Sequence, residues 1–233
     1  MYTLHSINDQ FLVVNKFPDV HFHKGATSVG LVQSIRNNLS LDELYPVHRL
    51  DTMTSGLLLF ARNHHTAQEI GSLFQNRTIE KYYIALAPGT PKKKQGMIKG
   101  DLKKGRSGQW VLSQSQKNPS LTRFISRGLG NGLRLYLLKP FTGRTHQLRV
   151  VMKSISVPIL GDPIYRNPEK HAINFDRGYL HSFAMRFRLG DSNFSFVVKP
   201  DIGMHFLSDE CRSMIQTMIE PWIFFESPNA GKP

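Results

Sequence analysis

The sequence contains a single cysteine, Cys211, and no long apolar run. One cysteine excludes an internal disulfide and is typical of a reducing compartment, so we expect a cytoplasmic protein. The longest apolar runs, Leu57–Ala61 and Tyr82–Ala87, are far shorter than the roughly 18–20 residues that cross a bilayer, which excludes an integral membrane protein. Residues 1–10 have no basic start followed by an apolar core, so no secretory signal is expected.

Familiar cofactor and metal motifs are also absent. There is no Gly-rich phosphate loop, no dinucleotide fingerprint and no cysteine cluster. His21 and His23 would share a strand face with Asp19, but alternate strand residues lie roughly 7 Å apart, which is awkward for binding one ion. His64 and His65 are adjacent near an expected helix start and are poorly placed to face one site together. We therefore expect neither a metal nor a nucleotide cofactor.

Acidic residues are nearly missing from one stretch of the chain. Residues 92–153 contain fifteen Lys and Arg and one acid, Asp101, whereas the rest of the chain is close to neutral. A regional excess of this size favours a polyanionic partner, because each neutralised phosphate releases counterions. A surface biased toward solubility is the alternative. Six of these lysines fall in residues 92–108, which we interpret as a mobile Lys-rich loop or hairpin.

The chain is long enough for a folded core. It has 233 residues, 40% hydrophobic and 10% aromatic, which suits one large domain or two packed lobes and excludes disorder as the main state. Hydrophobic patterning predicts strands over residues 11–16, 56–62, 79–87, 109–115, 121–127, 133–139, 183–189 and 194–199, and helices over 28–39, 64–77, from 145 onward and over 206–220. This mixture predicts an α+β fold: a mixed, largely antiparallel sheet with helices packed around it. No linker divides residues 1–233, so we expect the chain to form a single domain.

The segment Pro46–Ala61 is dense in chemically capable side chains. It places His48, Arg49 and Asp51 in an expected loop just before a buried strand, where catalytic residues commonly sit on a rigid support. An Asx turn, in which Asp51 bonds the following Thr and Ser, would explain the same pattern.

A second segment, Thr142–Ile155, supplies cations. Gly143 and Thr145 suit a turn and a helix cap, so Arg144 and the free amides of the first helical turn could hold a phosphate. Arg149 falls at the edge of the apolar helix face, and an unpaired buried charge is costly, so we expect an acidic partner for it. Because residues 92–153 contain only one acid, Asp101, that partner should come from elsewhere in the chain.

The third segment is the expected strand Lys81–Ala87. Strand alternation places Tyr82 on a core face and Tyr83 on the other face, together with Ala85 and Ala87. Two small residues would leave space for a ligand beside Tyr83. Packing against a helix would explain them equally well.

Taken together and in this order, the three segments resemble the RluA-type family of RNA pseudouridine synthases. The resemblance covers roughly residues 10–200, and the combination of motifs is highly specific although each motif alone is weak. The matching motifs are Asn15-Lys16, HRLD (48–51), TSGLLL (54–59), KYYIA (81–85), GRTHQLRV (143–150), VPILGDPIY (157–165) and Leu180-His181.

This resemblance implies roles for the matching residues. Asp51 corresponds to the nucleophilic aspartate, Tyr83 to the active-site tyrosine and Arg149 to the arginine that pairs with the aspartate. Arg49 corresponds to a residue that handles the flipped nucleotide. The implied reaction is isomerisation of uridine to pseudouridine in a cleft across the sheet, without cofactor or metal. A nearby arginine would orient the carboxylate and favour its ionised form.

The resemblance also implies structured RNA, tRNA or large-subunit rRNA, as the partner. Nothing in the sequence demands more than a monomer, so we expect a monomer. The core pattern begins by Phe11, so we expect no separate N-terminal RNA-binding domain. Two alternatives remain: a non-catalytic basic RNA-binding protein, and a nucleoside glycosidase that releases uracil. Candidate substrate-binding residues are His48, Arg49, Thr54, Arg144, His146 and Leu148, and candidate RNA-backbone contacts are Lys92, Lys93, Lys94, Lys103 and Lys104.

Overall fold

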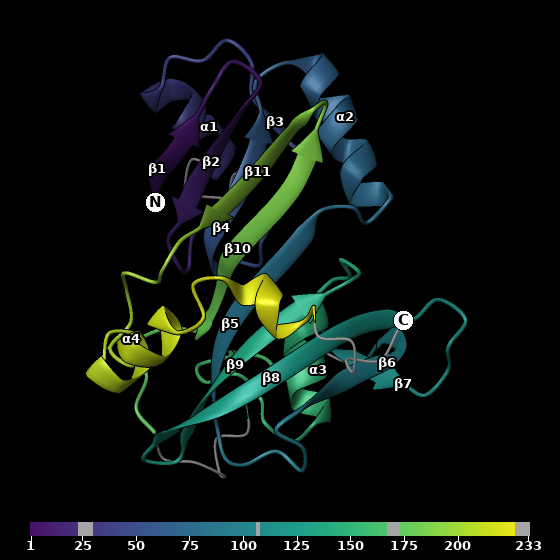
Figure 1. Ribbon diagram of the computed structural model, residues 1–233, viewed down its shortest axis with the longest axis vertical. Coiled ribbons are helices and arrows are strands. Elements are labelled where there is room, and N and C mark those ends of the chain that lie inside the picture. The colour runs from purple at the N-terminus through teal and green to yellow at the C-terminus, as the bar shows by residue number, and fades with distance from the viewer. Residues whose placement is uncertain (23–29, 106–107, 167–172, 227–233) are drawn as a thin grey trace. The chain divides into compact units, whose positions relative to one another are not determined.

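The chain divides into two compact units, each built from two separate stretches of sequence (Figure 1). Unit 1 comprises Met1–Glu80 and His181–Pro200, and unit 2 comprises Lys81–Leu180 and Asp201–Pro233. The computed structural model describes residues 1–22, 30–105, 108–166 and 173–226.

Unit 1 is a twisted sheet with two helices. Its strand order is β1-β2-β4-β10, with β3 beside β4 and β11 beside β10. β4 and β10 pair in parallel, and the other pairs are antiparallel. Figure 1 shows β10 and β11 in green, and a hydrogen bond between Ser55 and His181 joins positions 126 residues apart. The elements are β1 (Tyr2–Ile7), β2 (Phe11–Lys16), α1 (Leu31–Asn38), β3 (Tyr45–Pro46), β4 (Ser55–Ala61), α2 (His64–Gln75), β10 (Leu180–Leu189) and β11 (Ser192–Val197).

The core of unit 1 explains why its two chain segments stay together. Every residue of β2 and of β4 is buried, as expected for strands that read as continuous apolar runs. Phe11 of β2 packs edge-to-face on Phe187 of β10 and Phe194 of β11, with ring centroids 5.8 and 4.9 Å apart. Ile70 of α2 is fully buried in the same cluster. The second stretch of unit 1, His181–Pro200, thus completes the core that the first 80 residues begin.

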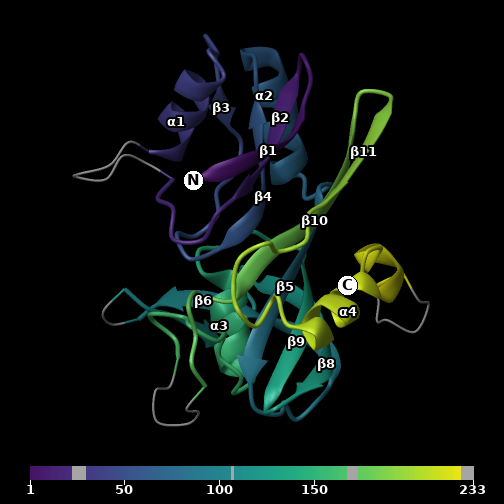
Figure 2. The same ribbon diagram turned by 90° about the vertical axis from the view of Figure 1, so that its left-hand side faces the viewer.

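Unit 2 is an antiparallel sheet in the order β5-β9-β8-β6-β7. Figure 2 shows α3 on one face of this sheet and the C-terminal segment with α4 on the other. The sheet face on the side of α4 carries Tyr82, whose ring contacts Trp222 and Phe225. The elements are β5 (Glu80–Pro88), β6 (Gln95–Lys104), β7 (Trp110–Ser113), β8 (Ser120–Gly130), β9 (Leu133–Pro140), α3 (Gln147–Ser154), α4 (Asp209–Gln216) and the 3-10 helix η1 (Pro221–Phe224).

The expected fold class is confirmed: the strands form mixed, mostly antiparallel pairings with helices on their faces. The edge strand β1 was not predicted. Two local predictions were wrong: α4 is shorter than the expected helix over residues 206–220, and the expected strand around Asp19 is absent. Asp19 and His21 do not lie in a strand, since Asp19 has a left-handed φ of 59°; His23 falls outside the described residues.

Candidate active site

The loop that carries Asp51 leads directly into the buried strand β4. Asp51 is half-buried, its neighbour Arg49 is exposed, and Thr54 is buried. The backbone carbonyl of Asp51 accepts the Thr54 N–H at 3.0 Å, which closes a tight turn before the strand. Gly56 then adopts a φ of +104°, and a Cβ there would lie 2.3 Å from the Ser182 carbonyl oxygen of β10. Only glycine lets the two parallel strands approach this closely.

Lys16 stabilises this loop through hydrogen bonds to backbone carbonyls. Its side chain is fully buried, and its ammonium donates to the carbonyls of Phe17 at 2.9 Å, Val20 at 3.2 Å and Thr52 at 3.0 Å. An ammonium has three donors, so these bonds satisfy it inside the protein. The residue next to Asp51 is thereby tied to the end of β2.

Two histidines form hydrogen bonds to β4, the strand that follows this loop. The His48 Nε2 accepts the backbone N–H of Leu59 at 2.9 Å, and its ring stacks on Phe74 with centroids 4.8 Å apart. His181 is fully buried, with Nδ1 2.8 Å from the Ser55 hydroxyl and Nε2 2.8 Å from the Val198 carbonyl. A carbonyl only accepts, so Nε2 of His181 carries a proton and donates.

In unit 2, Tyr83 lies on the sheet face that α3 covers. It is half-buried on β5 and pairs with Leu138 of β9. Thr122 of the same face bonds the side chain of Gln147, the first residue of α3. Ala85 is fully buried on this face. α3 therefore packs on this face of the sheet through β8, and both explanations for the small residues of β5 stay open.

Arg149 of α3 is held by a buried ion pair. It is only 3% exposed, and it forms a bidentate ion pair with the fully buried Asp162: Nε donates to Oδ2 at 2.7 Å and Nη2 to Oδ1 at 2.8 Å. The Oδ1 of Asp162 also accepts the N–H groups of Ile164 at 2.8 Å and Tyr165 at 3.0 Å. The expectation of an acidic partner from outside residues 92–153 is confirmed. The pairing of Arg149 with Asp51 joins residues of different units and stays a prediction.

Tyr165 completes the support of Arg149. The Arg149 guanidinium lies 5.1 Å from the centre of the Tyr165 ring, a cation–π contact. The Tyr165 hydroxyl accepts the N–H of Trp110 at 2.8 Å and lies 3.1 Å from His146 Nδ1. His146, a candidate substrate-binding residue, is thus linked to the same network. Gly161 precedes Asp162, and its φ of +72° places it where a Cβ would lie 2.0 Å from the Arg177 carbonyl oxygen.

The expected cap at Thr145 was wrong. The N-cap of α3 is His146, which has a left-handed φ of 54° and makes no side-chain capping bond. Gln147 shapes this turn instead: its Oε1 accepts the Arg144 N–H at 3.0 Å and the Thr142 hydroxyl at 2.7 Å. The backbone N–H of Arg144 is therefore occupied, while its exposed guanidinium hydrogen-bonds to the Asn118 side chain. Leu148, another candidate, is buried.

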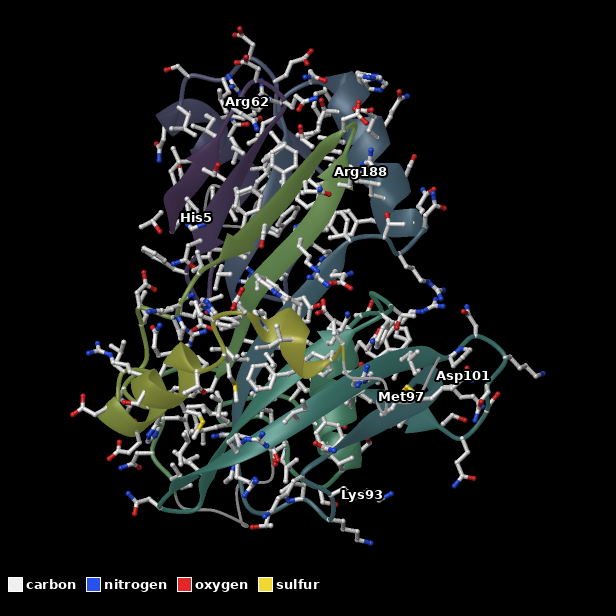
Figure 3. The ribbon with its side chains drawn as sticks, viewed as in Figure 1. His5, Arg62, Lys93, Met97, Asp101 and Arg188 are labelled. Carbon is white, nitrogen blue, oxygen red and sulfur yellow. The ribbon has the colours of Figure 1, made fainter. Side chains whose placement is uncertain are left out.

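The candidate RNA-backbone lysines all lie on the surface around the first strand of a hairpin. β6 pairs with β7 in antiparallel register, with Lys103 opposite Val111 and Lys104 opposite Trp110. Figure 3 shows Lys93, Met97 and Asp101 along this part of unit 2. All five candidate lysines are exposed: Lys92, Lys93, Lys94, Lys103 and Lys104.

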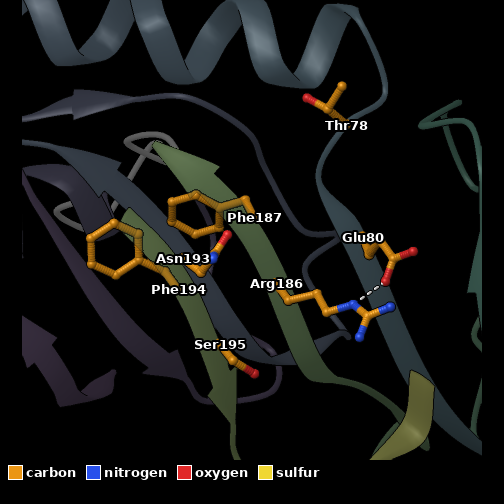
Figure 4. A pocket seen from close by; sticks show the side chains of 7 residues that line it. All are labelled: Thr78, Glu80, Arg186, Phe187, Asn193, Phe194 and Ser195. Carbon is orange, nitrogen blue, oxygen red and sulfur yellow. Dashed lines mark hydrogen bonds and ion pairs between the residues drawn. The ribbon is translucent and has the colours of Figure 1, made fainter. Parts of the chain in front are cut away.

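The described part of the chain contains no group of three or more His, Cys, Asp or Glu side chains that could hold a metal ion. None of its helices is long and apolar enough to cross a membrane. An open pocket of about 490 Å³ lies in unit 1 beside the Glu80–Arg186 ion pair (Figure 4). None of the predicted site residues lines this pocket.

Comparison with known proteins defines the class of this molecule. A family model described as RNA pseudouridylate synthase matches residues 10–154, more than half of the chain. A Haemophilus influenzae protein named "Uncharacterized RNA pseudouridine synthase" is 41% identical over 213 residues, which cover 91% of this chain and 93% of that protein. The solved structure of human RNA Pseudouridylate Synthase Domain Containing 1 matches with a TM-score of 0.76 and 26% identity, covering 94% of each chain.

Relatives of lower identity indicate which family of pseudouridine synthases the chain belongs to. The dual-specificity RNA pseudouridine synthase RluA of Vibrio cholerae is 38% identical over 60% of this chain and 58% of its own length. The ribosomal large subunit pseudouridine synthase D of Borreliella burgdorferi is 32% identical over 70% of this chain, and the match spans about half, 51%, of that protein. The chain belongs to the RluA-type family of RNA pseudouridine synthases, which are RNA-modifying isomerases.

Proposed function

We propose that the uridines isomerised by this protein lie in structured tRNA or large-subunit rRNA, and that Asp51 is the nucleophile. The observation that supports this most is the placement of Asp51 on a loop fixed by a buried lysine and leading into a fully buried strand. A reacting carboxylate needs a rigid support of this kind, because small displacements from the reactive geometry lower the rate steeply.

The reaction is internally balanced. The N1–C1′ glycosidic bond breaks, the uracil turns, and a C5–C1′ bond forms; the proton on C5 is lost and N1 gains one. No electrons are gained or lost overall, so we expect no nucleotide cofactor and no metal. The carboxylate of Asp51 either adds covalently to the nucleotide or abstracts a sugar proton, and both routes need its ionised form.

Three further residues have roles in this proposal. Arg149 orients the carboxylate of Asp51, and its own orientation is set by the two hydrogen bonds to Asp162. Tyr83 stacks on the uracil and assists removal of the C5 proton. The exposed Arg49 contacts the nucleotide that has left the RNA helix.

Extrusion of the target nucleotide costs a few kcal/mol, and contacts to RNA phosphates offset this cost. The exposed lysines before and along β6 are suited to that task. His48, Thr54, His146 and Leu148 line or support the nucleotide site in this proposal. We further propose a monomer that acts in the cytoplasm, where its RNA substrates occur.

The direct test is Asp51→Asn, assayed by mapping pseudouridine in cellular tRNA and rRNA from strains that lack the gene and carry either version. We expect wild type to restore the missing pseudouridines, and Asp51→Asn to restore none while still binding RNA. Asp9→Asn, an exposed acid of the same unit, is the matched control and should remain fully active. An active Asp51→Asn protein would refute the nucleophile, and a non-catalytic RNA-binding protein would be insensitive to this change.

A further inference from the structure

Asp101 is the single acid among the fifteen basic residues of positions 92–153. It lies on the hairpin strand β6 and is labelled in Figure 3. A carboxylate on a surface that attracts a polyanion lowers affinity through like-charge repulsion. The hydrogen bonds of Asp101 indicate a structural role that compensates for this loss of affinity.

The carboxylate of Asp101 organises the loop that follows β7. Its Oδ2 accepts the backbone N–H of Lys117 at 3.1 Å, and its Oδ1 accepts that of Asn118 at 3.0 Å. Its own N–H donates to the Ser115 carbonyl at 2.9 Å. Hydrogen bonds from the Ser115 hydroxyl and from these two amides lower the pKa of Asp101, with a smaller contribution from Lys103. The loop is therefore held by an ionised carboxylate at neutral pH.

The loop in turn holds Arg144. The Asn118 side chain, on the residue whose amide Asp101 binds, accepts a hydrogen bond from the Arg144 guanidinium. Lys117, Asn118 and Arg144 are all exposed. A continuous set of hydrogen bonds thus leads from the only acid of the basic region to one of its arginines.

We propose that residues 115–118 and Arg144 form one contact surface for RNA phosphates, and that Asp101 is the positioning residue that sets its shape. Phosphate oxygens accept charge-assisted hydrogen bonds from Lys117 and Arg144. The Asn118 side chain takes a hydrogen bond from Nη2 of Arg144, and a guanidinium has five N–H donors, so Arg144 can bind a phosphate while Asn118 still holds it. This inference rests on the proposed function only in taking RNA as the partner.

The proposal predicts the opposite sign from simple electrostatics. If Asp101 acted only by repelling phosphates, removing its negative charge from a basic surface should tighten RNA binding. In Asp101→Asn, however, the side-chain amide places an NH₂ group against one of two backbone donors, so at least one anchoring bond is lost. We expect the dissociation constant for unfractionated bacterial tRNA to rise about three- to tenfold. Unchanged or tighter binding would overturn the proposal.

Coupling to Arg144 is the second arm of the experiment. Arg144→Gln should weaken tRNA binding and lower the slope of log affinity against log salt by about one. The double variant Asp101→Asn/Arg144→Gln should bind within about twofold of Arg144→Gln alone, because both changes disable one surface. Fully additive losses would show that Asp101 does not act through Arg144.

Controls separate this surface from folding and from catalysis. Asp191→Asn removes the same charge from an exposed acid on unit 1 and should not weaken binding. Amide hydrogen exchange should accelerate at Lys117 and Asn118 in Asp101→Asn, with the thermal unfolding midpoint unchanged. If that variant does not fold, Asn118→Ala tests the same surface and should also weaken binding. These binding measurements involve no turnover, so a wild-type protein that forms no pseudouridine would refute the proposed function and leave them interpretable.

Discussion

Lys16 in unit 1 and Arg149 in unit 2 are both buried cations, but different acceptors hold them. Backbone carbonyls of three residues hold the Lys16 ammonium, whereas one carboxylate holds the Arg149 guanidinium along a single edge. A compact ammonium ties several backbone segments together, and a planar guanidinium fixes an orientation. Lysine here secures the path of a loop, and arginine presents a directed charge.

The largest effect is expected from Asp162→Asn. It leaves the Arg149 charge buried without its full counter-charge, which costs about 3–5 kcal/mol of unfolding free energy. Urea unfolding monitored by circular dichroism measures this loss. Asp191→Asn, which touches only a surface ion pair, should change stability little.

A double replacement then separates folding from catalysis. Arg149→Met/Asp162→Leu removes both charges, and an apolar pair of similar size often restores stability. We expect a folded protein without pseudouridine synthase activity. An active double variant would show that Arg149 has no part in the chemistry.

Lys16→Met should have the next largest effect. It removes the donor shared by the carbonyls of Phe17, Val20 and Thr52, and unsatisfied buried acceptors cost about 2–4 kcal/mol in total after relaxation. The same change at the exposed Lys99 should be nearly neutral. If thermal unfolding shows equal effects at both positions, Lys16 does not secure the Asp51 loop.

His48→Leu should have the smallest effect of the three. It keeps an apolar side chain against Phe74 but removes the acceptor for the Leu59 N–H, at a cost of about 1–2 kcal/mol. His5→Leu, at an exposed histidine of β1, is the control and should leave stability unchanged. A large loss of kcat/KM without loss of stability would instead indicate that His48 contacts substrate directly.

Much of the fold was predictable because its central strands are strongly apolar. The strand over Phe11–Lys16 was predicted with its observed bounds, since all six residues are buried. β1 was missed because it is an edge strand whose residues are mostly exposed, and such a strand has little hydrophobic signal.

The supporting contacts of the site were not predictable in the same way. Motif order suggested Asp51, Tyr83 and Arg149, but Asp162 becomes the partner of Arg149 only through tertiary packing. Lys16 binds backbone carbonyls, which every residue has, so no side-chain pattern marks its acceptors. The left-handed conformation of His146 depends on Gln147 folding the turn back, and the sequence alone favoured Thr145 as the cap.

The division of unit 1 between two stretches of chain has a consequence for its synthesis on the ribosome. Residues 1–80 emerge first, but the core positions of Met185, Phe187 and Leu189 follow only after the whole of Lys81–Leu180 has been made. Until then the apolar side chains of Leu57 and Leu59 lack part of their packing, and one edge of β4 lacks its parallel partner. A nascent chain halted within residues 81–180 would therefore present an apolar strand with one incompletely paired edge, the kind of surface that chaperones bind and that otherwise aggregates.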